Sequence, residues 1–108
     1  MKMSYRFMRL IVMFDLPVLT SHEQREYSKF RKYLIKNGYV MLQKSIYCKL
    51  IQNAVAADAL LDNLKKNKPD KGLVQVLKIT EKQFSKMECI VGEYCTEILN
   101  TDERLVIL

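Results

Sequence analysis

The sequence has few of the residues that build disulfide frameworks or metal clusters. Its three cysteines, Cys48, Cys89 and Cys95, are widely spaced and form no CxxC pair, so we expect reduced, mostly packed thiols and no cysteine-based zinc module. His22 is the only histidine, and we expect it on the surface. No DxD or HxH motif occurs, and the sequence therefore offers no second metal site and no evident general base.

Long apolar runs and flexible linkers are also missing. No stretch approaches the ~20 apolar residues that span a bilayer, and residues 1–7 are too short and too interrupted by charge for a secretory signal. We therefore expect one domain over residues 1–108, no membrane association and a cytoplasmic location. A chain of this length is too small for a deep, enclosed active site, which makes a site shared between subunits reasonable.

The charge balance favours a polyanionic partner. Eighteen Lys and Arg residues stand against twelve Asp and Glu residues, for a net charge of +6. An excess of this size attracts nucleic acid without proving that the protein binds it.

The first predicted strand ends in a carboxylate. Residues 10–14 are an uninterrupted apolar run typical of a central strand, and Pro17, which has no amide hydrogen, marks where pairing must stop. Asp15 is therefore expected at the carboxyl end of a buried strand. An aspartate in this position is either a candidate metal ligand or simply bonds nearby amides.

A helix of about 16 residues is predicted next. Thr20 with Glu23 and Ser21 with Gln24 form two overlapping capping boxes, and Gly38 supplies the left-handed residue that ends the helix. Four cations recur along one side of this helix at spacings of four, three and four residues: Arg25, Lys29, Lys32 and Lys36. They form either an ordinary solvated face or a track for phosphates.

The remaining pattern completes a βαββαβ core over about residues 8–80. Residues 39–43 and 45–50 read as a tight or bulged hairpin, residues 53–67 as a helix, and residues 73–79 as a fourth strand. Right-handed crossovers then give an α+β, ferredoxin-like fold with a four-stranded antiparallel sheet and both helices on one face. The bare opposite face predicts a homodimer.

The C-terminal extension, residues 81–108, is predicted to dock on the partner subunit. A capping box at Thr80 and Gln83 opens a short helical turn, residues 88–93 are strand-like, and residues 104–108 form a last apolar strand. An apolar strand with unpaired edges would tend to pair with other chains and aggregate, so we expect strand exchange within the dimer.

The sequence resembles the CRISPR-associated Cas2 family over nearly its whole length. The matching segments are residues 14–17, 43–47, 77–84 and 90–93, in this order and spacing. The length and the late C-terminal strand are most similar to members from type II systems. The resemblance implies a ferredoxin-like homodimer in which Asp15 faces its symmetry mate and binds Mg²⁺ or another divalent cation.

Two functions of different classes follow from this resemblance. Members are described as metal-dependent endonucleases on RNA or DNA, which makes Asp15 the candidate catalytic residue. In the adaptation complex the subunit instead bridges two dimers of the CRISPR adaptation integrase and holds the duplex DNA of a new spacer. The alternative is a ferredoxin-like toxin ribonuclease or nucleic-acid-binding regulator that acts without an integrase.

Overall fold

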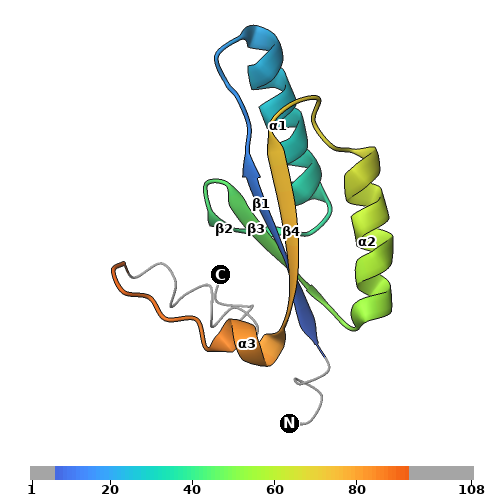
Figure 1. The fold of residues 1–108 in the computed structure, drawn as a ribbon, viewed down its shortest axis with the longest axis vertical. Helices are drawn as coiled ribbons and strands as arrows, with labels where there is room; N and C mark the ends of the chain where they lie inside the picture. The colour runs from blue at the N-terminus through green and yellow to red at the C-terminus, as the bar shows by residue number, and fades with distance from the viewer. Residues whose placement is uncertain (1–6, 93–108) are drawn as a thin grey trace.

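The computed structural model describes residues 7–92, and it confirms the βαββαβ core (Figure 1). The elements, in chain order, are β1 (Met8–Asp15), α1 (Ser21–Lys36), β2 (Val40–Gln43), β3 (Ile46–Ile51), α2 (Ala54–Lys66), β4 (Leu73–Thr80) and α3 (Glu81–Ser85).

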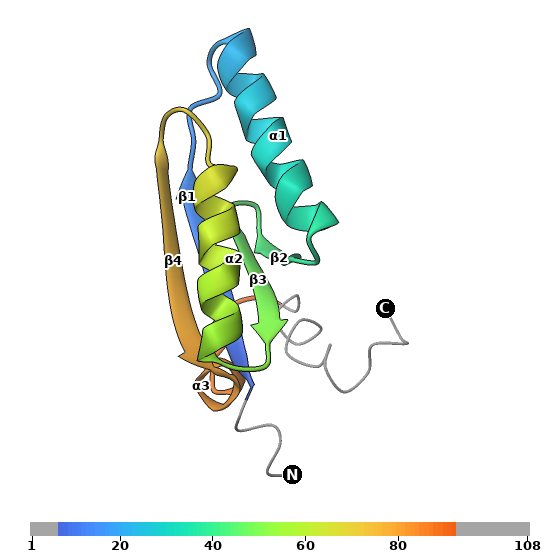
Figure 2. The ribbon, with the colours of Figure 1, turned by 90° about the vertical axis from the view of Figure 1, so that its right-hand side faces the viewer.

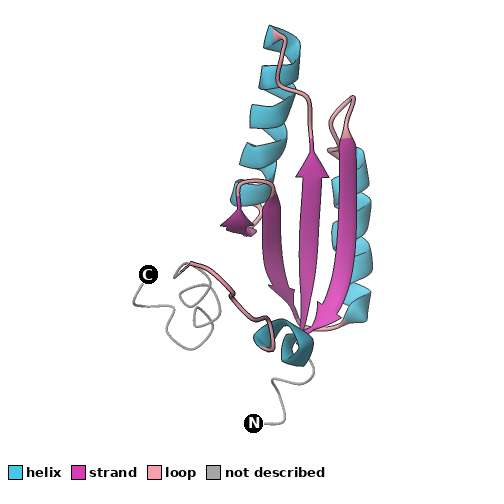
Figure 3. Ribbon diagram, turned by 60° about the vertical axis from the view of Figure 1, so that its left-hand side comes forward, coloured by secondary structure: helices cyan, strands magenta, loops and turns pink. Residues whose placement is uncertain are grey.

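The four strands form one antiparallel sheet in the order β2-β3-β1-β4 (Figure 3). β1 is central and is paired along its length with β4, from Met8 opposite Thr80 to Asp15 opposite Leu73. The β2–β3 hairpin carries an irregularity between Met41 and Gln43, which confirms the bulged hairpin expected from the short separation of its strands.

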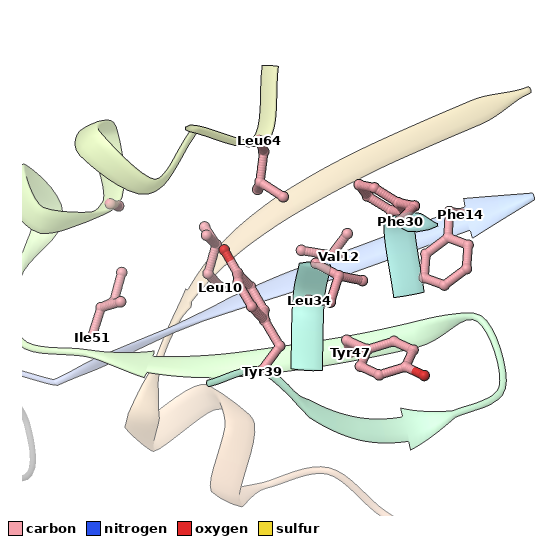
Figure 4. Packing of buried hydrophobic residues seen from close by; sticks show 10 residues of the cluster. Leu10, Val12, Phe14, Phe30, Leu34, Tyr39, Tyr47, Ile51 and Leu64 are labelled. Atoms are coloured by element: carbon pink, nitrogen blue, oxygen red, sulfur yellow. The ribbon is translucent and has the colours of Figure 1, made fainter. Parts of the chain in front are cut away.

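Both long helices lie on one face of the sheet, where they bury the main core (Figure 2). Phe14 on β1 meets the ring of Phe30 on α1 at 5.3 Å, edge to face, and the ring of Tyr47 on β3 at 5.8 Å (Figure 4). The other buried members of this core come from β1, α1, β3, α2 and the connection between α1 and β2: Leu10, Val12, Leu34, Tyr39, Ile51, Ala57 and Leu64. This packing sets how α1 sits over the carboxyl end of β1.

The opposite face of the sheet is bare only in part. The α3 residue Phe84 is buried against Ile11 and Cys48. Arg9 is also buried here: its guanidinium donates to both carboxylate oxygens of Glu81, at 2.7 and 3.2 Å, and lies 4.4 Å from the Phe84 ring centroid. Glu81 therefore joins α3 to β1.

The strand expected at residues 88–93 does not form over its described part, residues 88–92. Ile90 and Val91 are 85% and 90% exposed, and a strand needs a neighbouring strand to satisfy its backbone, which this segment does not have among the described residues. The last strand predicted at residues 104–108 lies outside the described residues. Of the predicted thiols, Cys48 is packed but Cys89 is exposed.

Among the described helices, none has the length and apolar character required to cross a lipid bilayer.

Candidate metal site and nucleic-acid interface

Asp15 lies where the sequence places it, as the exposed last residue of β1. It lines an open groove of about 400 Å³ formed by the ends of β1 and β4 and by the β2–β3 turn. The other lining residues are Met13, Phe14, Gln43, Lys44, Ser45, Ile46, Leu73 and Gln75. Asp15 is the only carboxylate among them, and Lys44 is the only cation.

The turn before β4 fits closely around the end of β1. Gly72 has φ +100°, a left-handed conformation that favours glycine, and a Cβ built on it would lie 2.7 Å from the backbone oxygen of Asp15. A Cβ there would also lie 2.7 Å from the Leu16 side chain. The position of the Asp15 backbone is therefore determined from two sides, by the β1 ladder and by this turn.

The groove meets the requirements of an Mg²⁺ site in part, because its described lining contains one carboxylate, that of Asp15. Mg²⁺ keeps several waters and commonly takes one or two carboxylates together with substrate phosphates. Among the described residues this groove supplies one such ligand, and the polar residues Gln43, Ser45 and Gln75 also line it. No second carboxylate lines the groove among residues 7–92, and another copy of the chain would bring one.

The α1 helix begins as one of its two predicted capping boxes requires. Thr20 accepts from the amide of Glu23, and Glu23 Oε1 accepts from the amides of Leu19 and Thr20 at 2.9 and 3.1 Å. These backbone hydrogen bonds, that of Thr20 first, lower the pKa of the Glu23 carboxyl. The second box does not form, because Ser21 is already the first residue of the helix; the Gln24 side-chain amide donates to the Val18 carbonyl instead.

All four predicted cations of α1 are exposed: Arg25, Lys29, Lys32 and Lys36. Their spacing places them within an arc of about 60° and along about 16 Å of helix axis. The buried α1 residues Phe30 and Leu34 lie on the opposite side of the helix, so this line of cations points away from the core. Within residues 7–92, none of the four forms an ion pair with an acidic side chain.

The structure does not bring the two predicted features together. None of the four α1 cations lines the groove that holds Asp15. The carboxylate and the line of cations are therefore separate candidate sites within one chain.

The structure also brings together three side chains that the sequence did not link: His22, Glu26 and Asp70. His22 Nε2 lies 2.9 Å from Asp70 Oδ2, and the Glu26 carboxylate accepts from the Asp70 amide at 3.4 Å. His22 is exposed, as expected, but it has a carboxylate partner. Only the four-residue spacing of His22 and Glu26 on one helix was visible in advance, since Asp70 lies 44 residues beyond Glu26 in the sequence.

Comparison with known proteins gives one consistent result. The family model described as "CRISPR associated protein Cas2" matches residues 8–87. A relative from Treponema denticola is 58% identical over 101 residues, which is 94% of this chain and all of the relative. Relatives from Streptococcus mutans and Ligilactobacillus salivarius are 48% and 44% identical over 101 residues, or 94% of this chain and 93% and 100% of their own. All three are named CRISPR-associated endoribonuclease Cas2.

Proposed function

Because the chain belongs to the CRISPR-associated Cas2 family, we propose that it acts in CRISPR adaptation as a homodimer that bridges two integrase dimers and holds the duplex DNA of a new spacer. The observation that carries this proposal is the line of exposed cations on α1. Holding a duplex regardless of its sequence requires contacts to phosphates and no base-reading motif. Each phosphate that a cation neutralises releases counterions, which supplies the binding free energy.

The bare part of the sheet supports the proposed homodimer. Directly paired strand residues point to the same face, so Ile11, Asp15, Leu73 and Leu77 share the face opposite the helices. Leu73 and Leu77 remain 54% and 50% exposed there. A second copy packed on this face would cover these leucines, bring two Asp15 carboxylates toward a common axis and double the number of α1 cation lines.

Spacer integration in cells that carry the rest of the adaptation machinery tests this function. We expect Asp15→Ala to retain integration, whereas charge reversal of Arg25, Lys29 and Lys32 to glutamate abolishes it. The matched control reverses three exposed cations away from the line: Arg31, Lys78 and Lys86. Circular dichroism and light scattering establish that each variant is a folded dimer.

The comparison with the control decides the outcome. Loss of integration in both charge-reversed variants would mean that net charge matters and the α1 line does not. Loss of integration in Asp15→Ala alone would replace the scaffold with a function centred on the carboxylate.

A second candidate function is metal-dependent cleavage of RNA or DNA: the names of the relatives favour an endoribonuclease, and the exposed Asp15 offers a metal ligand. Two Asp15 carboxylates from a homodimer would supply a pair of ligands, where the described lining of one groove supplies a single carboxylate. Mg²⁺ bound there would lower the pKa of a water and offset charge on the attacked phosphate. Lys44, in the same groove, would lie close enough to assist with phosphate binding.

Cleavage is tested by incubating labelled RNA and DNA with the purified protein. We expect any genuine activity to require Mg²⁺ and to disappear in Asp15→Asn. Activity that survives in Asp15→Asn would come from another site or from a contaminant. Binding to nucleic acid or growth arrest in cells without an integrase would instead support a toxin ribonuclease or a regulator that acts alone.

A further inference from the structure

Three metal-ligating side chains converge beside the carboxyl end of β1, outside the Asp15 groove. His22 and Glu26 come from the first two turns of α1, and Asp70 comes from the connection between α2 and β4. One potential ligand atom from each lies within 4.8 Å of the other two. All three line one small cleft, whose other lining residues are Leu16, Pro17, Glu23, Pro69 and Lys71.

We propose that His22, Glu26 and Asp70 bind a divalent transition-metal ion of the Zn²⁺ class within a single chain. The donor set of one imidazole nitrogen and two carboxylate oxygens suits Zn²⁺ and does not suit Mg²⁺, which prefers oxygen ligands throughout. The proposal is independent of the dimer and of the proposed function at Asp15.

The separations suit such an ion. Ligands held at about 2.1 Å in tetrahedral geometry lie about 3.4 Å apart. The observed separations bracket this value, from 2.9 Å between His22 and Asp70 to at most 4.8 Å across the cluster. Small rotamer changes would reach it, because the His22 and Asp70 side chains are 59% and 63% exposed.

The way the residues are positioned also favours binding. His22 and Glu26 are four residues apart on a helix and therefore lie on the same side of it. The Asp70 amide donates to Glu26 Oε1, so the third ligand is held against the helix by its own backbone. Neighbouring Glu23 is not part of this cluster, and its Oε1 caps the helix.

A bound ion would join the start of α1 to the turn that precedes β4. This turn contains Gly72, which packs against the backbone of Asp15 and Leu16. The ion would therefore stiffen the two loops that flank the end of β1. Its role is structural, since none of its three ligands lines the Asp15 groove.

Titration of ZnCl₂ into the full-length protein, in buffer that contains excess Mg²⁺, tests the proposal by calorimetry. We expect one Zn²⁺ per chain, and at least a tenfold loss of affinity in both His22→Ala and Asp70→Asn. Asp58→Asn, which removes an exposed carboxylate from α2, is the matched control and should bind as the unmodified protein does. Zn²⁺ at tenfold excess over its Kd should raise the unfolding midpoint by about 5 °C.

Cysteine is the main competing ligand, and Co²⁺ distinguishes it. Co²⁺ bound by His22 and carboxylates gives no thiolate charge-transfer band, and Cys89→Ser should leave binding intact. The proposal is overturned if His22→Ala binds Zn²⁺ unchanged, if the Co²⁺ complex shows a thiolate band that Cys89→Ser removes, or if Mg²⁺ displaces Zn²⁺. Failure to bind Zn²⁺ would also overturn the proposal and leave His22 and Asp70 as a hydrogen-bonded pair only.

Discussion

The buried ion pair between Arg9 and Glu81 gives the sharpest prediction about stability. The Arg9 side chain is 5% exposed and that of Glu81 16% exposed, and two charge-assisted hydrogen bonds join them. The change to make is Glu81→Gln, which keeps the size of the side chain and removes its charge. The guanidinium would then remain buried beside Phe84 without its carboxylate.

The burial of the Arg9–Glu81 pair determines how much unfolding free energy is lost when the pair is broken. Removing one partner of a buried pair costs about 3–5 kcal/mol, because the remaining charge loses its charge-assisted hydrogen bonds to that partner. An exposed pair of the same geometry contributes only about 0–1 kcal/mol. Glutamine still offers one acceptor oxygen to Arg9, so we expect the lower end, a decrease of about 3 kcal/mol in the free energy of unfolding.

Urea denaturation at a fixed protein concentration measures this decrease. Arg9→Met and the double variant complete a double-mutant cycle, which isolates the pair from the other contacts of each residue. The double variant should lose less stability than the sum of the losses of the two single variants. With methionine at position 9, no buried guanidinium loses its partner when Glu81 is changed. Glu88→Gln, an exposed carboxylate seven residues later, is the control and should change stability by less than about 0.5 kcal/mol.

A loss below about 1 kcal/mol in Glu81→Gln would refute this reasoning. So would additive losses around the cycle, since they would show that the two charges do not interact. Either result would mean that α3 is held on the sheet by Phe84 and not by the ion pair.

Three further predictions concern single residues. Lys32→Gln should reduce the slope of log Kd against log salt for duplex DNA by about 0.9, whereas Arg31→Gln, on the same helix but off the cation line, should leave that slope nearly unchanged in a fluorescence titration. Gly72→Ala should destabilise the protein by about 1–3 kcal/mol in urea, because it forces a strained backbone and a clash with Asp15; an unchanged midpoint would contradict the fit described at this turn. Burial raises the pKa of Tyr39 from 10.0 to about 12. Its contribution to stability is therefore complete below pH 10 and is lost as the pH rises toward 12, and Tyr39→Phe should remove that part of the alkaline loss in unfolding curves recorded from pH 9 to 12.

Much of the fold could be predicted because local signals agreed with the final packing. The apolar run before Asp15 became the central strand, and the capping boxes at Thr20 and Thr80 begin helices where the sequence placed them. The exposure of the α1 cations also followed from periodicity, because the apolar residues of that helix fixed which side faces the core.

The remaining features depend on contacts between distant residues. Arg9 and Glu81 are 72 residues apart, and nothing near either residue indicates that the pair is buried. The same holds for His22 and Asp70, which are 48 residues apart. At residues 88–92 the sequence predicts a strand that does not form. Their composition suits a strand, but composition alone does not show whether a neighbouring strand is present to pair with.

The order of the strands also affects how the protein can be made. Of the four described strands, β1 leaves the ribosome first, yet it lies between β3 and β4, and β4 ends at Thr80. At about 5–20 residues per second, β1 waits about 4–14 s for synthesis to reach the end of its second neighbour. During that time at least one edge of β1 has no neighbouring strand, so other nascent chains can pair with it. β1, the earliest described strand to be made, is therefore among the last to become paired along both edges.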